Sequence, residues 1–410
     1  SFVVQEVIEH YTSEGSDCHV LLLDASKAFD RIHFVKLFQL LIQRRMCPMA
    51  IQLLLQMYTN QRLNVQWNSC TSDSFPCRNG VKQGGVLSPL LFCIYVDELL
   101  CRLQGLDVGC RIGNSFAAAF GYADDLTILA PSIPAAETLL RTCEHFAEEY
   151  FVQFNASKSQ HLICRGRNTN HNEIPLLKLN GDVIPQCDHA VLLGTSIGAD
   201  CQAKSFQKAS SELVSRTNTL LSRFNHCNSA VLFSLFQTYC CSFYASSLWS
   251  FESRHFNSFI VSWRKCVKKV WRISQRTHSR LLPHIIAGPD VRLCILARFA
   301  SFIKACFLSE NDIVRDAFEL SMSSQSAVAR NVRVLLYELR MRLEDVTCAS
   351  KDLIKRRLMR RFVGEHVIDD HCVGRAIAEL CFTRDGVLSL EFGWLEIREV
   401  IDMLCVFEPP

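Results

Sequence analysis

The sequence lacks a long hydrophobic run, and this absence disfavours a membrane-spanning protein. Its longest apolar stretch, around residues 86–96, is about half of the roughly 20 residues that a transmembrane helix needs. The N-terminal residues also lack the pattern of a secretory signal. We therefore expect a protein with no membrane partner, located in the cytoplasm and the nucleus.

Paired cysteines are missing, although cysteine itself is abundant. The chain has 21 cysteines, but none of them form the C-x-x-C pairs that mark many zinc and redox sites. Several lie within apolar or helical patterns, namely Cys18, Cys93, Cys143, Cys164 and Cys266. We interpret them as reduced and mostly buried small hydrophobic residues, rather than as the framework of a disulfide-rich scaffold.

A strong net charge, internal repeats and low-complexity linkers are also absent. The 410 residues carry a net charge of +3 with a pI near 8.0, which neither predicts nor excludes a nucleic-acid partner. Hydrophobic residues make up 49% and charged residues 21% of the chain, as in ordinary globular proteins. This length allows two or three domains with substantial cores.

Two adjacent carboxylates, Asp124 and Asp125, stand between two short apolar runs at residues 115–120 and 126–130. The pattern predicts a β-hairpin with the acidic pair at its turn. Adjacent carboxylates repel each other, and they are tolerated when a cation lies between them or when water reaches both. Taken alone, such a pair is more often a solvated turn.

A third carboxylate changes this interpretation. Residues 19–24 form a continuous apolar run that ends in Asp24, as expected of a strand buried on both faces. Three acids at adjacent strand ends can hold two divalent cations about 3.5–4 Å apart, which is the arrangement used for nucleotidyl transfer. Asp24, Asp124 and Asp125 are therefore the candidate metal ligands.

Three segments resemble successive motifs of the reverse transcriptase of non-LTR (LINE-type) retrotransposons. They are residues 22–32 (LLDASKAFDRI), 79–91 (NGVKQGGVLSPLL) and 121–125 (GYADD), and their order and spacing match as well. The similarity is clearest from residue 1 to about 198 and extends more weakly to about 340. It implies an RNA-directed DNA polymerase with two Mg²⁺ ions, an RNA template, a DNA primer or target DNA, and dNTP substrates. The oligomeric state stays open.

The resemblance also implies roles for further residues. Ala25 and Phe29 would contact the incoming nucleotide, with the Phe29 ring excluding a 2′-hydroxyl; the alternative is a core aromatic. Gln83 and Gly84 would lie in a glycine loop against the nucleotide or template, unless that loop is a plain turn before a helix. Lys158 would stand near the triphosphate and assist the leaving pyrophosphate, or else it is a surface lysine.

The predicted fold is α+β. Residues 1–200 would form a right-hand polymerase palm with partial fingers, built on an antiparallel sheet with flanking helices. Residues 201–340 would form an all-helical thumb, and residues 341–410 a C-terminal helical region of unknown role. Within the palm, the segment Leu192, Leu193 and Gly194 resembles a primer-grip hairpin, although the family usually has an aromatic residue where Leu192 stands.

A basic stretch supports the thumb assignment. Residues 254–304 contain eleven Lys and Arg against one acid, interleaved with Phe256, Phe259, Trp263 and Trp271. This pattern is typical either of a solvated helix face or of a groove that follows a phosphate backbone. We expect it to hold the template–primer duplex. A second basic helix is predicted at residues 351–361, either RNA-binding or merely solvated, and the histidines near the first stretch lack zinc-ligand spacing.

The chain starts at Ser1 without a methionine, and the fingers motifs of the family would precede this point. We therefore expect an N-terminally truncated fragment. The main alternative function is a catalytically inactive nucleic-acid-binding remnant of such an element, because a missing fingers region would leave the triphosphate partly uncaged. An intron-encoded or telomerase-type reverse transcriptase is a further alternative and predicts the same metals.

Overall fold

The computed structural model describes residues 1–167, 175–286, 288–324 and 326–365. The chain divides into two compact units, one comprising residues 1–201 and 306–329 and the other residues 202–305 and 330–410. Every helix among the described residues is too short or too polar to cross a lipid bilayer.

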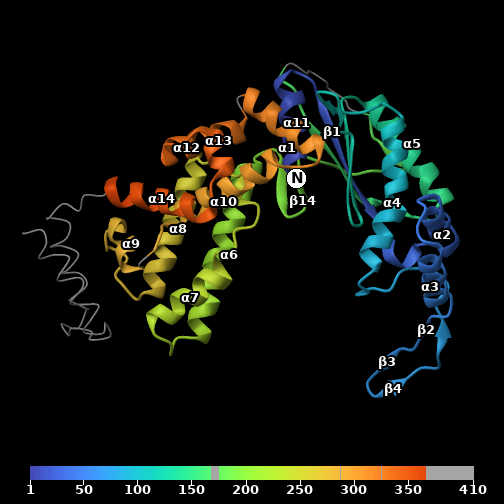
Figure 1. Cartoon of the computed structure of the whole chain (residues 1–410), viewed down its shortest axis with the longest axis horizontal. Helices are drawn as coiled ribbons and strands as arrows, with labels where there is room; N and C mark the ends of the chain where they lie inside the picture. Colours follow the sequence, from blue (N-terminus) through green and yellow to red (C-terminus); the bar gives the residue numbers. More distant parts are fainter. Residues whose placement is uncertain (168–174, 287, 325, 366–410) are drawn as a thin grey trace, which may run out of the picture. The chain divides into compact units, whose positions relative to one another are not determined.

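The first unit is built on a five-stranded sheet in the order β13–β10–β1–β9–β8 (Figure 1). The strands are β1 (Cys18–Ala25), β8 (Ala119–Tyr122), β9 (Asp125–Ala130), β10 (Phe154–Cys164) and β13 (Gln186–Cys187). The central strand β1 runs antiparallel to both neighbours, and its apolar residues Val20, Leu21 and Leu23 are buried. The buried strand predicted at residues 19–24 is confirmed.

Helices flank this sheet because each carries an apolar stripe at helical spacing. They are α1 (Phe2–Ser13), α2 (Phe34–Gln43), α3 (Pro48–Thr59), α4 (Ser88–Gly105) and α5 (Ile133–Glu149). In α4 the stripe is Leu91, Tyr95 and Leu99, which joins the main hydrophobic core of the unit. Helix α4 lies against β8 and α5 against β9, so the predicted α+β class is confirmed.

One helix from late in the sequence completes the first unit. Helix α11 (Asp312–Ser323), predicted as part of the thumb-like region, packs against α1 and against the short strands β6 (Arg111–Ile112) and β7 (Ser115–Phe116). At this contact Glu6 of α1 is 4% exposed, and burial raises its pKa to about 8, with a further increase from Glu9 and an opposing hydrogen bond with Ser321 of α11.

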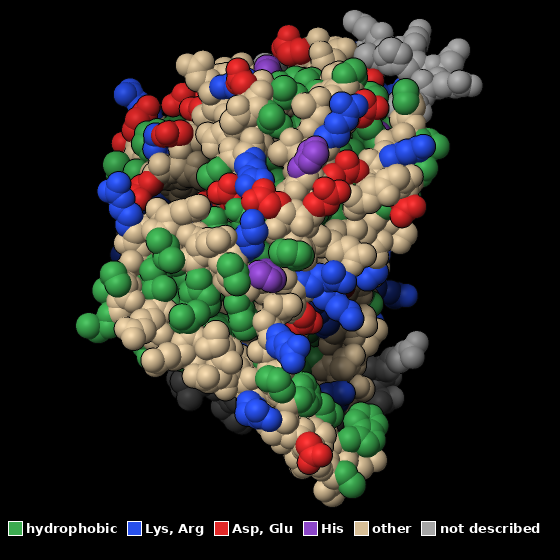
Figure 2. All heavy atoms as spheres, turned by 90° about the vertical axis from the view of Figure 1, so that its right-hand side faces the viewer, with side chains coloured by type: hydrophobic (Ala, Val, Ile, Leu, Met, Phe, Trp, Pro, Cys, Tyr) green, Lys and Arg blue, Asp and Glu red, His purple; other side chains and the backbone are tan. Residues whose placement is uncertain are grey.

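Two hairpins differ from the predicted strands. The alternation of residues 62–69 predicts a single strand, but the segment lies in an exposed ribbon in which β2 (Arg62–Leu63) pairs with β5 (Phe75–Pro76) and β3 (Gln66–Trp67) with β4 (Cys70–Thr71). The ribbon exposes Trp67, which is 76% exposed, and Figure 2 shows hydrophobic side chains gathered at the lower end of the molecule. The expected strand at residues 115–120 is likewise split, because β7 pairs with β6 across the turn at Gly113.

The first unit contains two further hairpins. Strand β11 (Lys178–Leu179) pairs with β12 (Asp182–Val183), and β14 (His189–Leu192) pairs with β15 (Thr195–Gly198). The turn of the second hairpin has Leu193 at φ 47° and Gly194 at φ 76°, so it is the tight hairpin predicted there.

The described part of the second unit is helical. It contains α6 (Cys201–Arg223), α7 (Ser229–Cys240), α8 (Arg254–Val270), α9 (Leu282–Ile285), α10 (Val291–Phe307), α12 (Ala327–Leu339), α13 (Leu343–Cys348) and α14 (Lys351–Glu365), with the boundary residues of α6, α10 and α12 in the first unit. The apolar pattern of residues 231–249 predicts one helix as far as Trp249, but α7 ends nine residues earlier, at Cys240. The basic helix predicted at residues 351–361 lies within α14.

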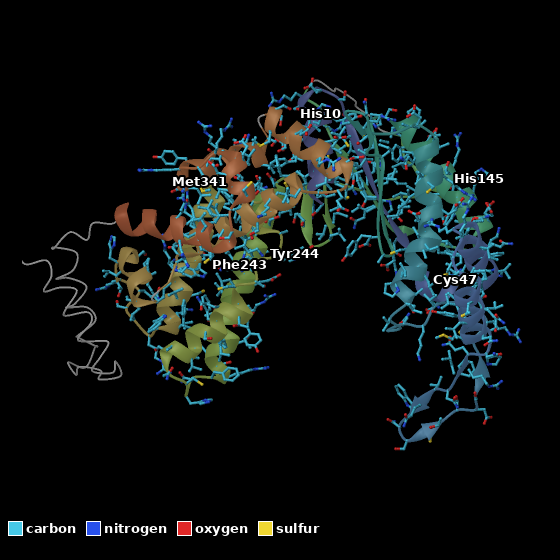
Figure 3. The ribbon with its side chains drawn as sticks, viewed as in Figure 1. His10, Cys47, His145, Phe243, Tyr244 and Met341 are labelled. Atoms are coloured by element: carbon cyan, nitrogen blue, oxygen red, sulfur yellow. The ribbon has the colours of Figure 1, made fainter. Side chains whose placement is uncertain are left out.

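The cysteines form no disulfide among the residues that the structure describes. Cys18, Cys143, Cys164 and Cys266 are buried as predicted, and burial raises the pKa of the Cys143 thiol. Cys93 is instead exposed, because it lies on the outer side of α4. Cys47, labelled in Figure 3, is also exposed, next to the proline that begins α3.

Candidate active site

The structure brings the three predicted carboxylates to one end of the sheet. Asp24, near the end of β1, is the direct cross-strand partner of Asp125, the first residue of β9. Tyr122 pairs with Asp125, so Ala123 and Asp124 form the two-residue turn of the β8–β9 hairpin. Ala123 takes the left-handed conformation at φ 50°, which this tight turn requires. The acidic hairpin predicted from the sequence is therefore present.

The carboxylates influence one another electrostatically. The pKa of Asp125 is raised, first by partial burial and then by the negative charges of Asp124 and Asp24. Asp124 and Asp125 are exposed and Asp24 is half-buried, so a solvated cation has access to all three. Oxygen ligands and concentrated negative charge suit Mg²⁺. Within the described ranges, however, no group of three or more His, Cys, Asp or Glu side chains is already arranged to hold a metal ion.

Phe29 lies directly after the strand that carries Asp24. β1 ends at Ala25, which pairs with Phe154 of β10, and the chain then forms the 3-10 turn Ala28–Arg31. The half-buried Phe29 ring stacks on Phe92 of α4, with ring centroids 4.6 Å apart and an interplanar angle of 21°. Both interpretations of Phe29 are therefore compatible with its position, since one face packs on the core and the residue stays partly exposed.

The glycine loop is tied to this same 3-10 turn. The Gly80 and Val81 amides donate to the carbonyls of Ile32 and Phe29, each at 2.8 Å. The Gln83 side chain donates to Asp30 Oδ1 at 3.3 Å. These bonds place Gln83 in the same neighbourhood as Phe29.

Gly84 has a backbone conformation that favours glycine, and there is open space beside it. Its φ of 78° favours glycine, and a Cβ atom there would meet no atom within 4 Å. The space beside its backbone is thus available to a ligand.

Lys158 is exposed on an irregular part of β10, next to Asn155, which pairs with Asp24 on the side opposite Asp125. Its backbone amide donates to Asn155 Oδ1 at 3.2 Å. Lys158 was predicted as a site residue from the sequence, whereas the buried Ser159 was not. The Ser159 hydroxyl accepts a hydrogen bond from the Asp24 amide at 3.2 Å. The only available signal was the mostly polar run at residues 155–160.

The basic stretch of the second unit differs from its predicted form. Phe256, Phe259 and Trp263 are each at most 3% exposed and form the core of α8, so they offer no stacking surface. Lys268 is also buried, and its ammonium donates to the carbonyls of Gln275 at 3.1 Å and Thr277 at 2.5 Å. The exposed cations on and just after α8 are Arg254, Lys265, Lys269, Arg272 and Arg276.

The predicted primer-grip hairpin has its first residue turned inward. Leu192 is 6% exposed, so its side chain belongs to the interior of the unit. A contact between this hairpin and a primer would therefore involve its turn residues, and the assignment stays a prediction.

A family model described as reverse transcriptase (RNA-dependent DNA polymerase) matches residues 2–197. The chain is 28% identical over 156 residues to the Pol polyprotein from the type-2 retrotransposable element R2DM of Drosophila melanogaster, covering 38% of this chain and 15% of that protein. It is 25% identical over 263 residues to the RNA-directed DNA polymerase from mobile element jockey of Drosophila funebris, covering 60% and 28%. The match to the probable RNA-directed DNA polymerase from transposon X-element of Drosophila melanogaster is 32% identical over 152 residues and covers 37% and 15%.

The matched segments thus span less than a third of each of these relatives. Among solved structures, a telomerase from Candida tropicalis, in complex with a fragment of telomeric RNA, aligns with 78% of this chain and 51% of that chain. The TM-score is 0.36 at 11% identity, which is too low to support an argument. Residues 2–197 belong to the reverse transcriptase family, and their relatives are the RNA-directed DNA polymerases of non-LTR (LINE-type) retrotransposons.

Proposed function

We propose that this chain is part of the polymerase of a LINE-type retrotransposon. It would add dNTPs to the 3′-hydroxyl of a DNA primer, or of nicked target DNA, on an RNA template. The observation that carries the proposal is the pairing of Asp24 with Asp125 beside the Asp124 turn, within a segment that matches the reverse transcriptase family. The predicted location in cytoplasm and nucleus belongs to the same proposal.

Asp24, Asp124 and Asp125 would hold two Mg²⁺ ions. When bound, these ions would activate the primer 3′-hydroxyl and neutralise the triphosphate. The donor set fits such ions because all three side chains offer carboxylate oxygens and all three are reachable from solvent. Partial burial, and then the charges of Asp124 and Asp24, raise the pKa of Asp125, and a cation between the carboxylates would relieve the part that comes from their mutual repulsion.

The remaining site residues would bind and orient the nucleotide. Ala25 and Phe29 would lie under its sugar, where the Phe29 ring would exclude a 2′-hydroxyl. Gln83 and Gly84 would approach the base or the template through the open side of their loop. The ammonium of Lys158 would donate a proton to the leaving pyrophosphate.

The second unit would supply the thumb. We propose residues 1–200 as the palm with partial fingers, residues 201–340 as the thumb, and residues 341–410 as a helical region without an assigned role. The duplex would be held through phosphate contacts by exposed cations such as Lys265 and Lys269, and not through the buried aromatics of α8.

Primer extension on an RNA template in the presence of Mg²⁺ tests the proposal. The chain is compared with Asp124→Asn, and Asp182→Asn in the exposed hairpin β11–β12 serves as a matched loss of one carboxylate elsewhere. We expect extension by the chain and by Asp182→Asn, and none by Asp124→Asn, with duplex binding kept in all three. Extension by Asp124→Asn would contradict the metal assignment.

The second candidate is the catalytically inactive nucleic-acid-binding remnant. It is favoured by the lack, among the described residues, of a three-ligand group already arranged to hold a metal ion. Duplex binding without extension by the chain would support this candidate.

A further inference from the structure

The strand next to Asp24 carries a large irregularity. β10 pairs in regular register with β1 from Cys164 opposite Cys18 to Gln160 opposite Leu22, and it pairs again at Asn155 opposite Asp24. Residues 156–159 of β10 therefore face a single residue of β1, Leu23. Bulges of this kind interrupt the hydrogen-bond ladder and often redirect side chains beside active sites.

The Ser159 hydroxyl supplies the hydrogen-bond acceptor that the interrupted ladder lacks at Asp24. Its side chain is fully buried, and its hydroxyl accepts a hydrogen bond from the Asp24 amide at 3.2 Å and donates one to the Asn155 carbonyl at 2.7 Å. A backbone carbonyl would occupy this accepting position in a regular ladder. The serine hydroxyl takes its place, so the Asp24 amide is not left without a partner in a half-buried position.

The bulge itself is held by a second set of hydrogen bonds. Asn155 Oδ1 accepts from the Ser157 hydroxyl at 2.8 Å and from the Lys158 amide at 3.2 Å. Asn155 thus fixes the exposed side of the bulge, where Lys158 stands, while Ser159 fixes its buried side. One hydrogen-bonded element therefore connects the backbone of Asp24 with the position of Lys158.

We propose that Ser159 is a positioning residue for the polymerase reaction. Its buried hydroxyl fixes the backbone of Asp24 at the end of β1 and so keeps the Asp24 carboxylate beside Asp125. This inference rests on the proposed function, because the placement of Asp24 affects catalysis only if Asp24 binds a divalent cation.

Cation binding provides a readout that does not depend on turnover. Mn²⁺ affinity is measured by electron paramagnetic resonance on the full chain with an RNA template, a dideoxy-terminated DNA primer and dNTP. The variants are Ser159→Ala, Ser159→Thr as the conservative replacement, and Ser13→Ala as the matched control, since the exposed Ser13 hydroxyl also donates to a backbone carbonyl, that of His10 at 2.9 Å, but lies at the end of α1 and outside the bulge. Ser159→Cys replaces the threonine variant if the added methyl group prevents folding.

We expect Ser159→Ala to weaken Mn²⁺ binding about tenfold, equivalent to ~1.4 kcal/mol, and to slow single-nucleotide incorporation by a similar factor. Its affinity for the duplex should stay within about twofold of the unaltered chain, because the duplex-binding cations are untouched. Ser159→Thr should restore Mn²⁺ affinity, and Ser13→Ala should leave it unchanged.

Three results separate the two proposals. If the unaltered chain binds Mn²⁺ and extends primers while Ser159→Ala matches it in both, the positioning role is wrong and the proposed function stands. If Ser159→Ala loses duplex binding and thermal stability together, and the conservative replacement does not restore cation binding, Ser159 is only structural and the inference is also wrong. If the unaltered chain neither binds Mn²⁺ nor extends, the proposed function fails and this inference fails with it.

Discussion

The buried carboxyl of Glu6 predicts a pH-dependent attachment of α11. Burial, together with the charge of Glu9, raises the pKa of Glu6 from 4.5 to about 8. The native state therefore keeps a proton that the unfolded chain releases above pH 4.5. The resulting stabilisation is complete below pH 4.5 and is lost as the pH rises through about 8.

The magnitude follows from the size of the shift. The change from 4.5 to about 8 spans roughly 3.5 pKa units, and at about 1.4 kcal/mol per unit it sets an upper limit of ~5 kcal/mol. Glu6→Gln keeps the shape and the hydrogen-bonding group but cannot ionise. The stability of Glu6→Gln relative to the unaltered chain should differ little below pH 4.5 and should be greater by a few kcal/mol at pH 8.

Hydrogen exchange measures the local stability of α11. The amide hydrogens of α11 are followed by mass spectrometry in both proteins at pH 5.5 and pH 8, always comparing the two proteins at the same pH. We expect stronger protection of α11 in Glu6→Gln at both pH values, with a free-energy difference about three times larger at pH 8 than at pH 5.5. Glu14→Gln, at the exposed end of α1, is the control and should change nothing. Equal protection of α11 in the unaltered chain and Glu6→Gln at pH 8 would refute the reasoning.

Four more predictions concern single side chains. Phe29→Ala should raise ribonucleotide incorporation by on the order of tenfold or more relative to deoxynucleotides. Unchanged sugar selectivity in primer extension would contradict the proposed exclusion of a 2′-hydroxyl by the Phe29 ring. Lys268→Met should destabilise the second unit by about 1–3 kcal/mol in thermal unfolding, because two carbonyls lose their buried donor. Lys269→Glu should instead weaken template–primer affinity and its salt dependence without lowering the melting temperature; unchanged affinity would contradict the thumb proposal. Burial, and then the charge of His19, lowers the pKa of His161 to about 4, so stability should fall as the pH drops from 6.5 towards 4, and His161→Gln should remove this component in acid unfolding.

The acidic site could be predicted because its signals are local. The apolar run before Asp24 and the two runs around Asp124 and Asp125 each encode a strand, and strands of this kind place their acids at a common edge. The position of the hairpin was predicted less well. Gly113 and Asn114 between Ile112 and Ser115 are a two-residue turn signal, and recognising it would have separated β7 from β8.

The second unit shows where local patterns mislead. Phe256, Phe259, Trp263 and Val267 recur at helical spacing, which is the pattern of a buried stripe, and the intervening cations made it resemble a binding surface. The burial of Lys268 was beyond sequence reasoning, because its partners are backbone carbonyls of a segment that folds back on the helix. Ser159 was missed for a similar reason, since its importance depends on the bulge in β10.

The return of α11 to the first unit has a consequence for how the protein is made and divided. Residues 1–201 are synthesised before residues 306–329. The first unit therefore lacks its last helix until more than a hundred further residues have been added. During that interval the face of α1 that contains Glu6 has no α11 to cover it. A fragment cut at residue 197, where the family match ends, would carry all three candidate carboxylates and still lack a piece of its own domain.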